Sequence, residues 1–119
     1  FDALVSPVFG GAGTLADPAA APEVFAQLSP PDQVAAAMAR LVAEPHGPRS
    51  QPLRLTPERW GGLPRTYIEC RHDRTIPISS QRLMQALTPG ARVVTLESDP
   101  SPFLCQPEAL AAALIAAIP

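Results

Sequence analysis

Two short polar loops hold the residues that could take part in acid–base chemistry. Arg71-His72-Asp73-Arg74 follows an apolar, β-branched run ending at Cys70, and Ser98-Asp99-Pro100 follows a second apolar run that ends near Glu97. If both runs are parallel strands, these loops lie at the carboxyl edge of the sheet, where open α/β sheets carry their chemistry. We therefore expect the two loops to be neighbours. The alternative for Asp73 is an ordinary surface carboxylate between two arginines.

The cysteines and histidines offer weaker candidates. Cys70 falls in a predicted buried strand, where a free thiol behaves as a small hydrophobic group. Cys105 precedes the last predicted helix, whose N-terminus could stabilise a thiolate, but the sequence offers no base for it. We interpret His46 and His72 as solvated surface histidines. No Cys/His pair has metal-ligand spacing, so we expect neither a metal nor a cofactor.

Composition excludes several classes of function. The chain has 119 residues, a formal net charge of -2 and only two cysteines, which indicates one domain without a disulfide framework. A pI of about 5.6 argues against nucleic acid as a partner. The longest apolar stretch, 109–118, is too short to cross a membrane, and residues 1–9 do not resemble a signal peptide. We expect a soluble, cytoplasmic protein. The glycines at 10, 11 and 13 match no phosphate-binding pattern and predict a plain turn.

The elements that position the two loops are the clearest in the sequence. Thr66–Cys70 and Val93–Leu96 read as strands, and Ser79–Leu87 reads as a helix that Gly90 ends. A strand, a helix and a strand within about 30 residues form a βαβ unit, with parallel strands and a right-handed crossover. Leucines and an isoleucine four residues apart predict a closing helix over Pro107–Ile118.

The first half of the chain is less regular. Leu4–Phe9 predicts a short strand at an edge, because it contains Pro7. Ser29–Glu44 predicts a helix with Ser29 as its N-cap, Asp32 completing a capping box and Pro45 ending it. The Pro-rich stretch 45–63 reads as an ordered linker with a helical turn over 57–60.

These elements divide the chain into three segments. Residues 1–22 form a strand-like segment and a connector, residues 23–63 a helix and a linker, and residues 64–119 a βαβα unit. Two parallel strands cannot cover both faces and both edges of a sheet, even with residues 4–9 as a third strand. The chain also begins with Phe1 rather than Met. We therefore expect a missing N-terminal half, or another chain, to complete the sheet.

A family resemblance joins these features. Residues 63–70, followed by Asp73, Ile76-Pro77 and Gln81, resemble the late part of the α/β-hydrolase fold. The similarity is greatest to the esterase branch of plant methylesterases and hydroxynitrile lyases. Residues 99–110 resemble the end of the same family, whereas the helix from Ser29 and residues 45–56 resemble the second half of its lid. The resemblance covers roughly residues 24–118.

The resemblance implies an incomplete α/β-hydrolase fold, in which a parallel βαβ unit, flanking helices and a helical lid remnant are present. It places Asp73 at the position of the catalytic-triad acid, which orients the imidazole. Two departures bear on activity. Pro100 stands where the family has its catalytic histidine, and no G-x-S-x-G pentapeptide is present. Because proline cannot accept a proton, we predict that this chain alone is inactive.

Two classes of function remain open. In the first, the chain is part of a carboxylic-ester hydrolase whose other half lies elsewhere, and Asp73 belongs to a composite site for a small-molecule ester. In the second, it is a non-catalytic binding or assembly module. Its incomplete sheet would then drive self-association into a homo-oligomer.

Overall fold

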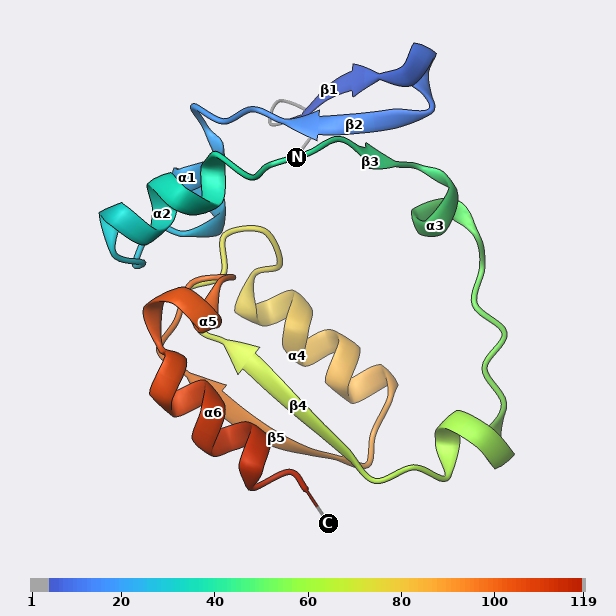
Figure 1. Cartoon of the computed structure of the whole chain (residues 1–119). Helices are drawn as coiled ribbons and strands as arrows, with labels where there is room; N and C mark the ends of the chain where they lie inside the picture. The colour runs from blue at the N-terminus through green and yellow to red at the C-terminus, as the bar shows by residue number, and fades with distance from the viewer. Residues whose placement is uncertain (1–4, 119) are drawn as a thin grey trace.

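The structure, a computed structural model, describes residues 5–118 and contains two separate sheets (Figure 1). One end of the chain supplies a small antiparallel sheet and two helices. The other supplies a parallel strand pair with its helices. In chain order the elements are β1 (Val5–Val8), η2 (Phe9–Gly11), β2 (Gly13–Ala16), α1 (Ala21–Phe25), α2 (Pro31–Met38), β3 (Glu44–Pro45), α3 (Gly47–Ser50), η3 (Pro57–Gly61), β4 (Arg65–Cys70), α4 (Ile78–Leu87), β5 (Ala91–Leu96), α5 (Pro102–Cys105) and α6 (Pro107–Ile115).

The predicted βαβ unit is confirmed. β4 and β5 pair in parallel over their full lengths, with Tyr67 opposite Val93 and Ile68 opposite Val94. α4 and α6 lie on opposite sides of this strand pair (Figure 1). Gly90, with a φ of 98°, makes the turn between α4 and β5, a left-handed conformation that favours glycine. α6 ends at Ile115, earlier than the predicted Ile118.

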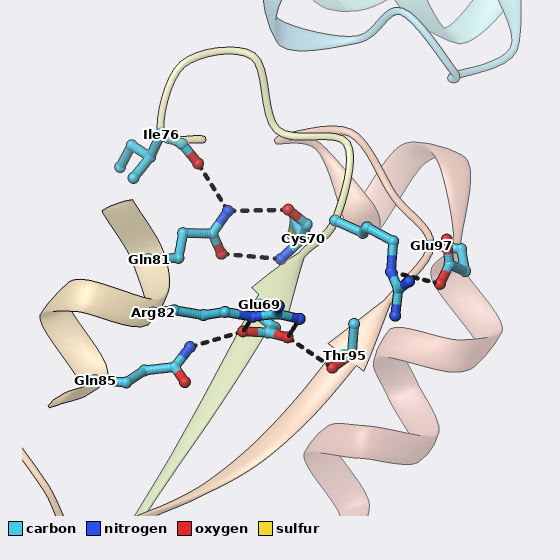
Figure 2. Close-up of polar contacts among 9 residues, drawn as sticks. Glu69, Cys70, Ile76, Gln81, Arg82, Gln85, Thr95 and Glu97 are labelled. Carbon is cyan, nitrogen blue, oxygen red and sulfur yellow. Dashed lines mark hydrogen bonds and ion pairs between the residues drawn. The ribbon is translucent and has the colours of Figure 1, made fainter. Parts of the chain in front are cut away.

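A buried carboxylate holds the βαβ unit together. Glu69 is only 2% exposed, and its side chain accepts hydrogen bonds from Arg82 and Gln85 on α4 and from Thr95 on β5 (Figure 2). Hydrogen bonding to Arg82 is the largest of the effects that lower the pKa of Glu69 to about 2. One side chain thus joins both strands to the crossover helix.

The strand predicted over Leu4–Phe9 is confirmed for Val5–Val8, and Leu4 lies outside the described residues. β1 does not join the sheet of β4 and β5. β1 instead forms an antiparallel hairpin with β2, which the sequence did not predict. Gly10 and Gly11 have φ values of 63° and 92°, and these left-handed conformations allow the chain to reverse tightly. β3 then pairs with β2 to complete a three-stranded sheet.

The helix predicted over Ser29–Glu44 is wrong at both ends. α2 begins at Pro31, because Pro30, at ψ 134°, is extended and Ser29 therefore lies one position before the N-cap. No side chain caps the helix, so the predicted capping box with Asp32 is absent. α2 ends at Met38 because residues 44 and 45 extend to pair with β2. Tertiary pairing, rather than Pro45, limits this helix.

The Pro-rich stretch forms a long connection around one side of the molecule (Figure 1). The helical turn predicted near Pro57 is present as η3, and the Thr56 hydroxyl oxygen accepts a hydrogen bond from the Arg59 backbone N–H at 3.3 Å. The short α3 was not predicted. Trp60 of η3 stacks on the Arg65 guanidinium, 4.0 Å from the ring centroid, which holds the end of the connection beside the start of β4.

The hydrophobic core is small. Among the described residues, the buried apolar side chains are mostly alanines, and many large ones remain exposed, including Leu87 on α4 and Ile115 on α6. Exposed apolar surfaces of this extent mark contact with further polypeptide or ligand. None of the helices within residues 5–118 has the length and hydrophobicity needed to cross a membrane.

The Glu69 network makes stability depend on pH. The folded-state pKa is lowered from the ordinary 4.5, so its contribution is present above pH 4.5 and is lost as the pH falls toward 2. We expect Glu69→Gln to reduce the free energy of unfolding by roughly 1–3 kcal/mol at pH 7. Urea denaturation should show this difference vanishing near pH 2. Glu97→Gln, at an exposed carboxylate, serves as the control and should change stability little at either pH.

Candidate functional site

The two polar loops are neighbours, as predicted. The Arg71 backbone N–H donates to the Leu96 carbonyl at 3.0 Å, and the His72 N–H donates to the Ser98 carbonyl at 2.9 Å. These bonds continue the pairing of β4 and β5 past the ends of the strands. They bring the residues on either side of Pro100 to the same sheet edge as Asp73.

Asp73 is held in a fixed orientation by its own loop. Its Oδ1 accepts hydrogen bonds from the Thr75 N–H, the Thr75 hydroxyl and the Ile76 N–H, at 2.7, 2.7 and 2.8 Å. Within the part of the chain that the structure describes, Oδ2 accepts no hydrogen bond. The side chain is half-buried. One carboxylate oxygen is therefore committed to the loop, whereas the other is available to an external donor.

Gln81 fixes the two ends of this loop. Its Nε2 donates to the carbonyls of Cys70 and Ile76 at 2.9 and 2.8 Å, and its Oε1 accepts from the Cys70 N–H at 3.0 Å (Figure 2). A single buried amide therefore bridges the end of β4 and the start of α4. The path of residues 71–75, and with it the position of Asp73, follows from these bonds.

Asp99, in the second loop, has no exposed surface, and its carboxylate accepts several hydrogen bonds. Oδ2 accepts from the Leu28 N–H and the Ser29 hydroxyl, both at 2.9 Å. Oδ1 accepts from the Ser101 N–H at 2.9 Å and from the Cys105 thiol at 3.2 Å. Every one of these donors compensates for burying the charge. The carboxylate thereby fastens residues 28–29 onto the end of β5.

Further polar contacts fasten α1 and the turn after it over both loops. Arg74 forms an ion pair with Glu23, and the Gln27 side-chain amide donates to the His72 carbonyl at 2.6 Å. The Ser101 hydroxyl donates to the Phe25 carbonyl at 2.7 Å. Residues 23–29 thus lie across the carboxyl ends of the parallel strands, which Figure 1 shows as α1 and α2 beyond the tip of β4.

Pro100 lies between two firmly held residues. Asp99 before it and Ser101 after it are buried, and the Ser101 N–H is bonded to the Asp99 carboxylate. Proline has no titratable group and no backbone N–H, so it can neither accept a proton from a nucleophile nor donate to Asp73. Position 100 therefore supplies no base beside Asp73.

The other titratable candidates do not supply that base. His72 is exposed, and its Nε2 lies 3.1 Å from Glu97 Oε2 on the surface. His46 lies just before α3, in the Pro-rich connection that precedes both loops in the chain. Burial raises the pKa values of the Cys70 and Cys105 thiols, so neither is poised as a thiolate. No group of metal-ligating side chains occurs within residues 5–118.

An apolar pocket of about 360 Å³ adjoins the Asp99–Ser101 loop. It lies between the antiparallel sheet, the α1–α2 region and α5. Thr14 and Arg49, joined by a 3.2 Å hydrogen bond, are polar members of a mainly apolar lining. The larger apolar side chains around it are Phe25, Met38, Leu41, Phe103 and Leu104. Its volume is that of a site for a small organic molecule.

Comparison with known proteins identifies relatives with a similar sequence and a similar fold. No protein-family model matches the chain. It is 31% identical over 83 residues to putative methylesterase 13, chloroplastic, of Arabidopsis thaliana, a match that spans 69% of this chain and 19% of that protein. It superposes on the crystal structure of a pyrethroid hydrolase from Sphingobium faniae with a TM-score of 0.82 at 31% identity, covering 96% of this chain and 46% of the hydrolase.

The crystal structure of an Arabidopsis methylesterase is similar as well, with a TM-score of 0.88 at 25% identity and coverage of 96% of this chain and 52% of the methylesterase. The chain belongs to the α/β-hydrolase superfamily. Within it, the chain matches the C-terminal part of the methylesterase-type esterases and spans about half the length of the related structures.

Sequence reasoning found the two loops but missed what holds them. Asp73 and Pro100 were identified from the motif, whereas the structural importance of Asp99, Ser29 and Gln27 was not. The signal for Asp99 was weak, because its donors come from residues about 70 positions earlier in the chain. Gln81 was part of the motif, yet its bonds to the loop ends became evident only in the structure.

The Asp99 contacts predict a large stability effect. Asp99→Ala leaves the buried Ser101 N–H and three partly buried donors without their acceptor, so we expect a loss of about 2–4 kcal/mol in the free energy of unfolding by urea. The exposed Asp32→Ala is the matched control and should cost less than about 1 kcal/mol. Equal losses in the two variants would contradict the role assigned to Asp99.

Proposed function

We propose that this chain carries the acid-bearing, lid-bearing part of an esterase-type α/β-hydrolase, and that its site binds an apolar carboxylic ester without hydrolysing it. In this proposal Asp73 occupies the triad-acid position, and residues 23–63 correspond to a lid. The observation that carries it is Pro100, held beside buried Asp99 at the carboxyl end of β5 where the catalytic histidine is expected.

The geometry of Asp73 supports its assignment. A triad acid must keep a fixed orientation while leaving an oxygen for the imidazole N–H. The loop donors that hold Oδ1 supply the first property, and the open Oδ2 supplies the second. The acid position is therefore intact in form, although the residue it would orient is replaced by proline.

The pocket supports ester binding. Its mainly apolar lining favours an uncharged ligand with an aryl or alkyl body, which gains free energy from leaving water. The relatives include proteins named as methylesterases and a pyrethroid hydrolase. These names support a carboxylic ester as the class of ligand.

A non-catalytic binding or assembly module is the second candidate function. The exposed apolar side chains on α4 and α6 favour it, because they provide surface for contact with another polypeptide. In this alternative the hydrolase fold is retained as a scaffold, and the pocket is incidental.

The chain should bind an ester without turning it over. We expect p-nitrophenyl butyrate to be hydrolysed no faster than in buffer, while calorimetry detects binding of 1-naphthyl butyrate. Leu104→Asp places a charge in the pocket and should weaken binding at least ~10-fold. Leu53→Asp, at an exposed leucine outside the pocket, is the control and should bind normally. Stoichiometric release of p-nitrophenol would contradict the absence of chemistry.

Restoring the histidine tests the position of Asp73. In Pro100→His, the nearby carboxylate should favour the imidazolium and raise the pKa of the new histidine about one unit or more above its usual 6.5. NMR titration of the ring resonances measures this pKa, with the parent chain identifying the signals of His46 and His72. Adding Asp73→Asn keeps the loop acceptors and should return the pKa toward 6.5. An unchanged pKa in the double variant would remove Asp73 from the triad-acid position.

A further inference from the structure

The apolar pocket described above has polar side chains at both of its ends. Ser101 lies at one end, where its hydroxyl donates to the carbonyl of Phe25, the last residue of α1. Thr14, Glu44 and Arg49 lie at the other end, on the antiparallel sheet and α3. Figure 1 shows α3 at the end of that sheet away from α1 and α2. The pocket therefore extends from the loop after β5 to a second group of polar side chains.

This second group, which we call the polar rim, consists of Thr14, Glu44 and Arg49. Thr14 on β2 and Glu44 on β3 are paired residues of the antiparallel sheet. Nη1 of Arg49 donates to the Thr14 hydroxyl oxygen at 3.2 Å and lies 3.6 Å from Oε2 of Glu44. These contacts place the guanidinium head of Arg49 beside the other two side chains at this end of the pocket.

The polar rim can donate hydrogen bonds to a ligand. Because the Thr14 oxygen accepts from Arg49, its own O–H can be donated to another acceptor. The guanidinium adds charged N–H donors, which form stronger hydrogen bonds than neutral ones. Glu44 offsets the positive charge of Arg49, so a ligand carboxylate would meet attraction and repulsion together. The rim therefore favours an uncharged oxygen acceptor over an anion.

We propose that the polar rim makes this pocket selective for esters whose apolar body carries an uncharged oxygen, such as an ether, at the end remote from the ester group. The inference rests on the proposed function, because it takes the pocket as an ester site. The ester group then lies toward Ser101, the apolar body lies along Met38 and Leu41, and the ether oxygen accepts from the rim.

Two esters that differ by one substituent test this selectivity. In calorimetry, the parent chain should bind 6-methoxy-2-naphthyl butyrate at least ~5-fold more tightly than 2-naphthyl butyrate, which is the effect of one hydrogen bond from a charged donor. Arg49→Met keeps the length of the side chain but removes its donors, and should bring the two affinities within ~2-fold of each other. Arg54→Met, at an exposed arginine outside the pocket, is the matched control and should keep the parent ratio.

Replacing Glu44 tests the charge balance. The parent chain should bind 6-carboxy-2-naphthyl butyrate more weakly than the methoxy ester. Glu44→Gln leaves the charge of Arg49 unopposed by Glu44 and should tighten binding of the carboxylate ester at least ~5-fold, with little change for 2-naphthyl butyrate. Glu58→Gln, at an exposed carboxylate outside the pocket, is the control and should leave all three affinities unchanged. This measurement decides the proposal even if Arg49→Met does not fold.

Equal affinity of the parent chain for the methoxy and unsubstituted esters would overturn the polar rim as the determinant of selectivity, while ester binding itself would stand. An unchanged ratio in Arg49→Met, or an unchanged affinity of Glu44→Gln for the carboxylate ester, would overturn it as well. Binding of neither uncharged ester would instead overturn the proposed function, and this inference with it.

Discussion

The buried carboxylate of Asp99 is the constraint on which the arrangement of this chain depends. The antiparallel sheet and the α1–α2 region are joined to the βαβ unit along the chain only by the long Pro-rich connection, which cannot fix their orientation. Asp99 accepts from residues 28 and 29 with one oxygen and from its own loop with the other. Because a buried charge is tolerated only when its donors are in place, the two parts of the molecule must meet in this geometry.

Inside the βαβ unit, two more buried polar side chains join separate elements through hydrogen bonds. Glu69 joins β4, β5 and α4, while Gln81 joins the end of β4 to the start of α4 (Figure 2). With so few large apolar side chains buried, packing alone gives little directional information. Hydrogen bonds to these three residues supply it, and they converge on the sheet end where the candidate site lies.

The features that the sequence could predict are those stabilised by interactions between residues close together in the chain. The βαβ unit was predictable because its periodicity and its glycine stop are local, and the position of Asp73 followed from a short motif. The Ser29 cap was wrong because Pro30 moved the helix start. The hairpin of β1 and β2 was missed because it depends on two left-handed glycines that read as a plain turn. The donors to Asp99 lie far away in sequence, and no local pattern indicates them.

The setting of Pro100 has an evolutionary consequence. Two of the four proline codons differ from a histidine codon by a single nucleotide, so from those codons one point mutation exchanges proline for histidine. The residues on either side are anchored by bonds that do not involve the proline side chain, and within residues 5–118 no donor reaches Oδ2 of Asp73. In the proposed triad arrangement, a histidine at position 100 would therefore require little remodelling of the backbone.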